Sequence, residues 1–360
     1  MLLEPYHMGV LTLHNRAVMA PMTRNRATTA HVPTPMMTNY YAQRATLGLL
    51  ITEGTSPSPD GLGYARIPGL FTDEHIAAWR QVTDAVHTHE AKIFMQFMHC
   101  GRASHIDNLP AGARVVSSTD VALPESIFAD SAGLQPASPP HALSEAEIAV
   151  VVTEFAHAGR CAMMAGFDGI ELHAANGYLI EQFLNANINH RTDGYGGSIA
   201  ARNRFALEIT RACVAEIGAD RVGVRISPYG VFNHSGAFPD VEHQFLALAT
   251  QLSVLGVVYL HLVDHESMGA PPIPQTFKVA LRKAFAGTFI ASGGFDYQSA
   301  EDALHGQEAD LIAFGRASLA NPDLLDRMED DVPLTPPTMA TFYTPGPLGY
   351  IDYPVAAGTR

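Results

Sequence analysis

The segment HAANGYLIEQFL, residues 173 to 184, places three side chains that can form hydrogen bonds within six positions. His173, Asn176 and Tyr178 stand at the end of an apolar run and just before a helix-like stretch. Together they could bind a polar group of a ligand and exchange a proton with it. Taken singly, each could equally belong to a core network, because buried polar groups usually bond to one another. The surrounding elements have to decide between these interpretations.

Apolar runs bounded by turn residues predict eight strands, most of them separated by helical patterns, which favours a parallel sheet. Eight such units fit a closed (β/α)₈ barrel better than an open doubly wound sheet, and no G-x-G-x-x-G motif follows the first strand. We therefore expect an α/β TIM barrel that occupies residues 1–360 as a single domain. The expected strands are residues 17–20, 49–54, 92–98, 169–173, 222–227, 257–263, 288–294 and 310–316, and the expected helices are residues 36–47, 73–89, 144–165, 198–217, 240–255 and 275–285.

Three further segments accompany the expected barrel. Residues 6–16, YHMGVLTLHNR, predict a short N-terminal hairpin that closes the barrel bottom. The loop after the third strand, residues 99–143, is unusually long, as lids and binding segments often are. The tail, residues 332–360, is rich in Pro, Gly and Tyr and predicts an ordered wrap or an active-site flap, not a helix.

Side chains along a barrel strand alternate between the interior and the surrounding helices, and catalytic side chains gather at the carboxyl ends of the strands. This alternation turns Gln96 inward in KIFMQFM, Glu171 and His173 inward in GIELH, and Arg225 inward in VGVRIS. A glutamine, a histidine and an arginine therefore converge on the mouth of the expected barrel.

The last two strands end in glycine-rich segments, ASGGFD and AFGRASLANPDL. Barrels commonly bind phosphate there through backbone N–H groups. Gly293, Gly294 and Gly315 would let the main chain approach an anion, and Arg316 could pair with it. The competing interpretation is that these glycines only cap short helices.

A phosphate site beside a polar mouth indicates a phosphorylated cofactor, and FMN fits the residue types. The flavin ring presents acceptors and one N–H donor, and the Gln96 amide can satisfy both kinds. Arg225 would stabilise negative charge on the reduced ring.

These residues stand in segments that resemble the Old Yellow Enzyme family of FMN-dependent ene-reductases. The likeness runs from about Ala17 to Pro354, and its segments occur in the family's order at the expected strand ends. Asn176 together with Thr23 is similar to the branch with one histidine and one asparagine as substrate donors. The matching segments are APMTRNRA, ITEGT, QFMHCGR, HAANGYLIEQFL, NHRTDGYGGSIAARNRF, VGVRISP, AFGR and GYIDYP.

The resemblance implies tightly bound, non-covalent FMN. Thr23 would bond the flavin O4, Gln96 and Arg225 would bind the pyrimidine edge, and the glycines named above would hold the phosphate with Arg316. The implied FMN contacts are Ala20, Pro21, Met22, Thr23, Gly54, Gln96, Arg225, Gly293, Gly294, Phe314, Gly315 and Arg316.

The resemblance also implies a ping-pong cycle with NADPH or NADH as hydride donor. The second half-reaction reduces the activated C=C bond of an α,β-unsaturated carbonyl or nitroalkene, or else a nitrate ester or nitro compound. Hydride leaves flavin N5, His173 and Asn176 donate to the substrate oxygen, and Tyr178 supplies the proton. These types suit the chemistry, because two donors stabilise the developing charge and tyrosine is protonated at neutral pH.

One departure from the family concerns the substrate pocket. Met98 stands where many relatives carry tryptophan, which replaces a flat wall by a flexible thioether. Phe232 and Asn233, after the fifth strand, are candidates to supply part of that wall, and Tyr343 in TFYTPG matches an aromatic residue that reaches the substrate from the tail. Tyr343 could instead be a surface-packing residue.

Composition narrows the class of protein. The chain is 47% hydrophobic and 16% charged, so it can bury a large core, and its net charge of −14 argues against nucleic acid or an anionic membrane as partner. The three cysteines are isolated, no metal site is evident, and the N-terminus shows no signal peptide. The stretch 246–263 is interrupted by polar residues and is expected to be helix and strand, not a membrane span. We expect a cytoplasmic monomer or homodimer.

Two other functions remain open from the sequence. A flavin-free barrel lyase or isomerase could use the same glycines for a substrate phosphate. Such enzymes usually need a lysine or a paired acid and base at the mouth, whereas Lys92, Lys278 and Lys283 fall at strand starts or on helices. A flavin-binding storage or sensor protein is the third possibility.

Overall fold

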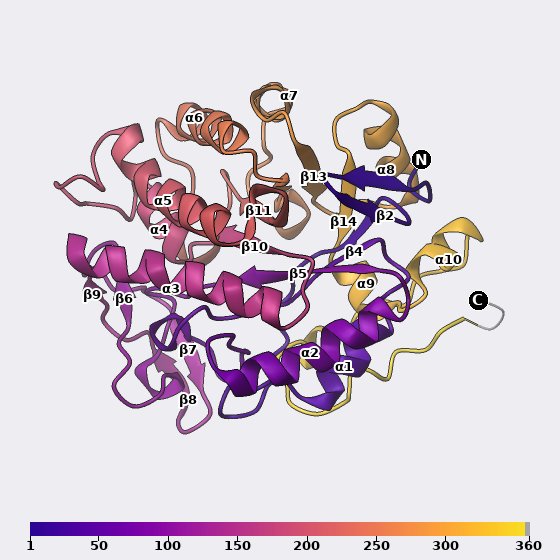
Figure 1. Ribbon diagram of the computed structural model, residues 1–360, viewed down its shortest axis with the longest axis horizontal. Coiled ribbons are helices and arrows are strands. Elements are labelled where there is room, and N and C mark those ends of the chain that lie inside the picture. The colour runs from indigo at the N-terminus through magenta and orange to yellow at the C-terminus, as the bar shows by residue number, and fades with distance from the viewer. Residues whose placement is uncertain (357–360) are drawn as a thin grey trace.

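The computed structural model describes residues 1–356, and its centre is a closed barrel of eight parallel strands (Figure 1). Each strand pairs with its sequence neighbour among the eight, and the last pairs with the first. This confirms the (β/α)₈ prediction. The barrel strands are β3 (Ala17–Met19), β4 (Leu49–Ile51), β5 (Lys92–Phe97), β10 (Gly169–Ala174), β11 (Val222–Ile226), β12 (Tyr259–Val263), β13 (Thr288–Ser292) and β14 (Leu311–Phe314).

Helices surround the strands, and all six predicted helices are present (Figure 1). Their ends differ little from the prediction except in α1, which ends at Ala42 and not at residue 47. Of four further helices, α4 is the helix-like stretch that follows Tyr178, and α8, α9 and α10 were not predicted; the N-terminus of α8 carries a capping box of Asp296 and Ser299. The predicted helices are α1 (Pro35–Ala42), α2 (Asp73–His87), α3 (Glu145–Met164), α5 (Ile199–Ile217), α6 (Val241–Val254) and α7 (Gln275–Ala284), and the others are α4 (Leu179–Leu184), α8 (Tyr297–His305), α9 (Arg316–Ala320) and α10 (Leu324–Glu329). Within residues 1–356, no helix has the length and apolar character needed to cross a membrane.

The expected hairpin is present as β1 (Tyr6–Met8) and β2 (Leu11–Leu13). Met8 and Leu13 pack with side chains of the barrel interior, and the Tyr6 hydroxyl lies 3.1 Å from the Thr288 hydroxyl at the start of β13. The hairpin therefore closes the amino-terminal end of the barrel, as predicted. The long loop contains the short strands β6 (Val116–Ser117), β7 (Ser126–Ala129), β8 (Gly133–Pro136) and β9 (His141–Ala142).

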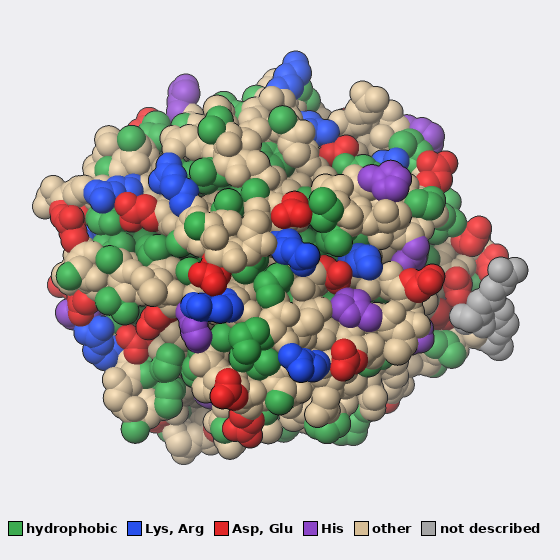
Figure 2. Space-filling model, in the orientation of Figure 1, with side chains coloured by type: hydrophobic (Ala, Val, Ile, Leu, Met, Phe, Trp, Pro, Cys, Tyr) green, Lys and Arg blue, Asp and Glu red, His purple; other side chains and the backbone are tan. Residues whose placement is uncertain are grey.

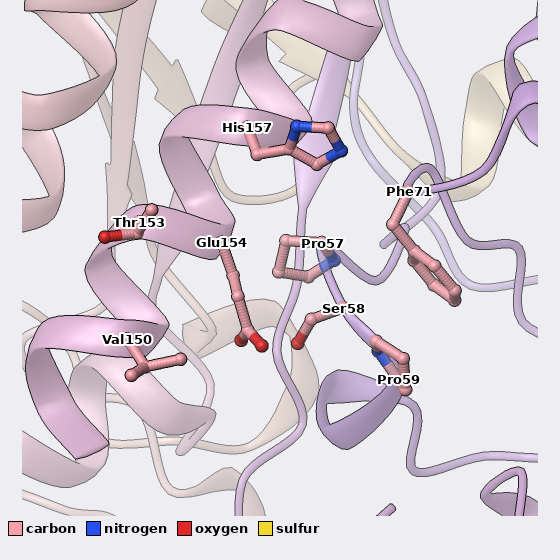
Figure 3. Close-up of a pocket in the computed structure, with 8 residues that line it drawn as sticks. All are labelled: Pro57, Ser58, Pro59, Phe71, Val150, Thr153, Glu154 and His157. Atoms are coloured by element: carbon pink, nitrogen blue, oxygen red, sulfur yellow. The ribbon is translucent and has the colours of Figure 1, made fainter.

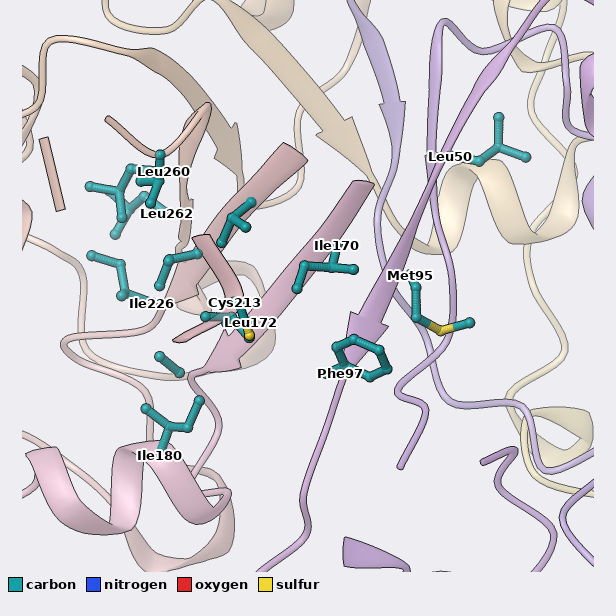
Figure 4. Packing of buried hydrophobic residues seen from close by; sticks show 14 of the residues in the cluster. Leu50, Met95, Phe97, Ile170, Leu172, Ile180, Cys213, Ile226, Leu260 and Leu262 are labelled. Atoms are coloured by element: carbon teal, nitrogen blue, oxygen red, sulfur yellow. The ribbon is translucent and has the colours of Figure 1, made fainter. Parts of the chain in front are cut away.

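Alternation along the strands creates two cores. The outer one, between strands and helices, includes Met95, Phe97, Ile170, Leu172 and Ile226 (Figure 4). The predicted parity of β5, β10 and β11 is therefore confirmed, because these alternate residues all face outward. The inner core consists of Met8, Leu13, Val18, Ala20, Leu49, Ile51, Phe94, Val258, Tyr259, Ile290, Leu311 and Ala313.

Two inward-facing glycines make room for the rings of Phe94 and Tyr259, which form the floor of the barrel interior. The Phe94 and Tyr259 rings lie 5.6 Å apart between centroids. A Cβ on Gly169 would overlap the Phe94 ring, and one on Gly223 would overlap the Tyr259 ring. Larger residues at these two positions would displace the two aromatic rings, which lie beneath the polar residues of the barrel mouth.

The C-terminal tail is ordered and wraps against the barrel as far as residue 356; residues 357–360 lie outside the described part. Two buried arginines hold it. Arg24 Nη2 donates to the Gly349 carbonyl at 2.7 Å, and Arg26 donates to the carbonyls of Thr341 and Phe342 at 2.8 and 2.7 Å. The wrap predicted from composition is thus confirmed, and buried guanidinium groups satisfied by backbone oxygens hold it in place.

The buried carboxyl group of Glu53 lies beside Arg24. It accepts hydrogen bonds from the Arg24 backbone N–H at 3.2 Å and the Tyr41 hydroxyl at 3.3 Å. Burial raises the pKa of Glu53 to about 7, against the opposing effect of those bonds. The group therefore changes charge near neutral pH inside the fold.

Gly223→Ala is expected to lower the free energy of unfolding by about 1–3 kcal/mol, because the added methyl group collides with Tyr259 in a packed interior. Gly159→Ala is the matched control: its Cβ would be 3.7 Å from the nearest atom, inside α3, so stability should rise by roughly 0.5–1 kcal/mol. Chemical denaturation of both variants checks this. Equal stability of the two variants would contradict the proposed packing of the floor.

Glu53→Gln should alter how stability depends on pH. The pKa of Glu53 is higher in the folded state than in the unfolded state, so the neutral carboxyl group stabilises the fold. This stabilisation is complete below the unfolded-state pKa of about 4.3 and is lost as pH rises through 7. The glutamine cannot ionise, so wild type should lose stability relative to the variant between pH 5 and 8. Denaturant titrations across this range measure the difference, with the exposed Glu329→Gln as control. Parallel pH profiles for wild type and Glu53→Gln would contradict the expectation.

Candidate active site

His173 lies near the carboxyl end of β10, in register with Arg225 of β11, and is 3% exposed. Its Nδ1 lies 3.3 Å from the Ala175 backbone N–H and accepts a hydrogen bond from it. A neutral ring that accepts at Nδ1 carries its proton on Nε2. Burial, followed by the charge of Arg225, holds the pKa of His173 well below its usual range. The ring is therefore a neutral donor at neutral pH.

The turn after β10 leaves the side chain of Asn176 free. Asn176 and Gly177 both have left-handed backbones, with φ of 60° and 71°. The Asn176 N–H donates to the Ser227 hydroxyl at 2.9 Å, and its carbonyl accepts from the Asn233 amide at 2.8 Å. Its side-chain Oδ1 is buried without a partner among the described residues. An unsatisfied buried amide of this kind is typical of a ligand site.

Tyr178 lies directly beside His173, with ring centroids 4.9 Å apart in an edge-to-face arrangement. Its hydroxyl is 3.4 Å from the hydroxyl of Tyr64, which comes from the long segment after β4. Burial raises the pKa of Tyr178 above its usual range, and the nearby Tyr343 adds to this. The structure thus brings together all three residues of the opening segment and adds Tyr64, for which the sequence offered no periodic or motif signal.

Below the mouth, the barrel interior holds the predicted polar residues. Gln96 Nε2 donates to Glu171 Oε1 at 2.8 Å, and Glu171 Oε2 lies 2.8 Å from His261 Nδ1. Arg225 is 6% exposed, and its Nε is buried without a partner among residues 1–356. Gln96, His173 and Arg225 face inward as the alternation predicted, and His261 of β12 joins them. It is a core residue, completely buried.

The loop after β3, which contains Ala20, Pro21, Met22 and Thr23, meets the end of β14. The Ala20 N–H donates to the Phe314 carbonyl at 3.0 Å. Phe314 itself packs its side chain in the outer core, so only its backbone reaches this edge. A Cβ on Gly315 would lie 3.7 Å from Met22 and 3.9 Å from Ala20, ordinary contact distances. The ends of β3 and β14 therefore lie together, and little side-chain bulk covers the backbone at Gly315.

Gly54 and Met98 pack against each other at the ends of β4 and β5. A Cβ on Gly54 would collide with the Met98 side chain, so glycine is needed for this approach. Met98 is 1% exposed and clusters with Leu62, Ile67 and Cys100 next to Tyr64 and Tyr178. The thioether therefore fills space immediately beneath the tyrosine pair.

The glycines predicted to bind phosphate lie together at the ends of β13 and β14. Gly294 has a left-handed φ of 88°, and a Cβ there would be 2.9 Å from Ser267. Arg316 is exposed, and its Nη2 lies 3.5 Å from the Ser267 carbonyl. Gly293 and Gly294 also line a pocket of about 260 Å³, where Lys278 pairs with Asp264 at 2.7 Å.

Phe232 and His265 form an aromatic pair at the rim, with centroids 4.8 Å apart. Phe232 is 41% exposed, whereas His265 is 6% exposed and its Nδ1 has no partner among the described residues. Burial lowers the pKa of His265 to about 4. Tyr343 is 60% exposed on the tail. In the part of the chain that the structure describes, no group of acidic, His and Cys residues could hold a metal ion.

A separate surface pocket of about 440 Å³ lies between α3 and the loop that contains residues 57–59 (Figure 3). Its lining includes Phe71, Glu154 and His157, and none of the predicted site residues. On the face shown in Figure 2, acidic and basic side chains are interspersed, and Lys and Arg do not gather in one patch.

Comparisons with known proteins agree with this geometry. Residues 1–335 match the model of the NADH:flavin oxidoreductase / NADH oxidase family. Chanoclavine-I aldehyde reductase fgaOx3 of Penicillium roqueforti is 44% identical over 99% of this chain and 96% of its own length. 12-Oxophytodienoate reductase 1 of Oryza sativa subsp. japonica is 43% identical over 98% and 92%.

Solved structures give the same result. Morphinone reductase superposes with a TM-score of 0.94 at 38% identity, covering 99% of this chain and 96% of the other. The old yellow enzyme homologue from Zymomonas mobilis gives 0.93 at 36%, covering 99% of both chains. These findings decide against a flavin-free lyase or isomerase. The chain belongs to the Old Yellow Enzyme family and is a flavin-dependent oxidoreductase that uses FMN and a nicotinamide nucleotide.

Proposed function

We propose that this enzyme reduces the activated C=C bond of α,β-unsaturated carbonyl compounds and nitroalkenes, with NADPH or NADH as reductant in a ping-pong cycle. The observation that carries the proposal is the grouping of a neutral His173, an unsatisfied Asn176 amide and a protonated Tyr178 at one barrel mouth. Relatives named as reductases of chanoclavine-I aldehyde, 12-oxophytodienoate and morphinone support the substrate class.

The residues present fit FMN. Arg225 offers a buried, unpartnered Nε–H, and Gln96 has an amide oxygen and one N–H left after its bond to Glu171. When bound, FMN supplies the hydride that reduces the alkene. The ring would be held by Ala20, Pro21, Met22, Thr23, Gly54, Gln96 and Arg225, and the phosphate by the backbone of Gly293, Gly294, Phe314 and Gly315 with the Arg316 side chain.

His173 and Asn176 hold the electron-withdrawing oxygen of the substrate. The bond from Ala175 to His173 Nδ1 leaves Nε2–H as the free donor, and the depressed pKa keeps the ring from acting as an acid. The Asn176 amide can present its NH₂ group, because its backbone and not its side chain fixes the turn. Two donors aimed at this oxygen stabilise the negative charge that develops there during reduction.

Tyr178 then protonates the α-carbon. Its raised pKa keeps the hydroxyl protonated at neutral pH. The Tyr64 hydroxyl at 3.4 Å provides a neighbour through which the proton can be replaced. Met98 and Phe232 would line the substrate pocket and Tyr343 would approach from the tail; the Met98 thioether would allow bulkier substrates than a rigid indole.

The proposed activity has a direct test. The purified protein should be yellow, release FMN on denaturation, and oxidise NADPH or NADH anaerobically in the presence of 2-cyclohexen-1-one with formation of cyclohexanone. A colourless protein that cannot be reconstituted with FMN would refute the proposal, and so would reduction of the flavin without any turnover of enones or nitroalkenes.

Tyr178→Phe should leave the rate of flavin reduction by the nicotinamide within about twofold, because that step needs no proton from the tyrosine. The oxidative half-reaction with cyclohexenone should slow by about 10²–10⁴-fold, the usual contribution of a positioned acid. Stopped-flow absorbance measures each half-reaction separately. Tyr64→Phe, which keeps the Tyr178 hydroxyl, serves as the matched variant and should retain most of the oxidative rate. Equal losses in both half-reactions of Tyr178→Phe would exclude the proton-donor role.

A further inference from the structure

Glu171 lies in the middle of the barrel interior, and its side chain has no role in the proposed catalytic cycle. It lies on β10 in register with Gln96 of β5 on one side and Gly223 of β11 on the other. Its exposed fraction is 0%. A buried carboxylate costs free energy unless donors surround it, so its partners indicate what it does.

Both carboxylate oxygens have a donor. Oε1 accepts from Gln96 Nε2 at 2.8 Å, and Oε2 accepts from His261 Nδ1 at 2.8 Å. His261 is neutral, since burial lowers its pKa, and its other nitrogen lies 3.3 Å from the Ser292 hydroxyl, which can donate to it. The proton on Nδ1 is thereby fixed, and each carboxylate oxygen of Glu171 accepts one hydrogen bond.

The bond to Glu171 fixes the orientation of the Gln96 amide. An ionised carboxylate only accepts hydrogen bonds, so the amide must turn its nitrogen toward Glu171. Its carbonyl oxygen then points elsewhere, and one N–H is left over. Without Glu171, a half-turn of the amide would exchange donor and acceptor at little cost. Gln96 can therefore present a defined edge to a ligand only because Glu171 holds it.

Glu171 also offsets a buried positive charge. Arg225 has no carboxylate within 4.0 Å among residues 1–356, and its Nε has no hydrogen-bond partner there. Burial lowers the pKa of Arg225, and the charge of Glu171 is the main effect that opposes this. Opposite charges in a poorly screened interior influence one another and any group bound beside them. His173 and His265, which also face this arginine, have depressed pKa values and are neutral.

We propose that Glu171 is a positioning residue that lowers the reduction potential of the bound flavin: it orients Gln96, and its negative charge offsets Arg225 in the interior below the residues that would hold FMN. The inference rests on the proposed function, since it assigns a role toward the same cofactor. Reduction adds negative charge to the flavin, so a fixed anion nearby disfavours the reduced form. A lower potential in turn strengthens hydride donation to the alkene.

Two variants separate the effect of the Glu171 charge from the effect of its side-chain length. Glu171→Gln removes the charge and keeps the size, so the ratio of affinities for reduced over oxidised FMN should rise about tenfold, which is about 30 mV for a two-electron couple. Glu171→Asp keeps the charge but shortens the side chain, so FMN should bind about tenfold more weakly with a nearly unchanged potential. Dye-linked equilibrium reduction gives the potential, and titration of the apoprotein with FMN gives the dissociation constant. Glu154→Gln, in the surface pocket beside α3, is the control for charge at a distance.

The outcomes are distinct. A folded, FMN-bound Glu171→Gln protein with the wild-type potential would overturn the charge role. Unchanged FMN affinity in Glu171→Asp would overturn the positioning role, and this measurement decides the matter if Glu171→Gln fails to fold. If wild type bound FMN but reduced no enone, the proposed function would fail while the potential shift could still be found. A wild-type protein unable to bind FMN would overturn both.

Discussion

Closure of eight parallel strands into a barrel is the constraint on which the rest of the structure depends. Once closed, the strands have no free edge, and every side chain must face either the helices or the interior. Residues such as Ile170 and Leu172 go outward into a continuous apolar layer, and their neighbours Glu171 and His173 have no choice but to face inward. The barrel thus forces polar groups from different strands into one small volume.

That volume is stable because its polar groups satisfy one another in layers. Phe94 and Tyr259 form an apolar floor, made possible by Gly169 and Gly223. Above it, Glu171 accepts from Gln96 and His261. The atoms left without partners in the described residues include Arg225 Nε and Asn176 Oδ1, both toward the mouth. Unsatisfied polar atoms therefore lie at the mouth, as a ligand site requires.

Much of this could be predicted from the sequence because period-two patterning is local. The parity of three short runs was enough to place Gln96, His173 and Arg225 together, whereas the phosphate site at the glycine-rich strand ends stays a prediction. The helices α8 and α10 and the pairing of Tyr64 with Tyr178 were not predicted. Tyr64 lies in an irregular loop without periodicity, so only the path of that loop in space brings its hydroxyl to the site.

By itself, the sequence determined the class of fold, the inward set of strand residues and the family, since these follow from patterning and from motifs in a fixed order. The tertiary structure alone decided the chemistry of each group. The proton of His173 is assigned to Nε2 by a bond from Ala175, the Gln96 amide is oriented by Glu171, and the tail is held by Arg24 and Arg26. Protonation and orientation depend on burial and on partners far apart in the chain, which no local pattern records.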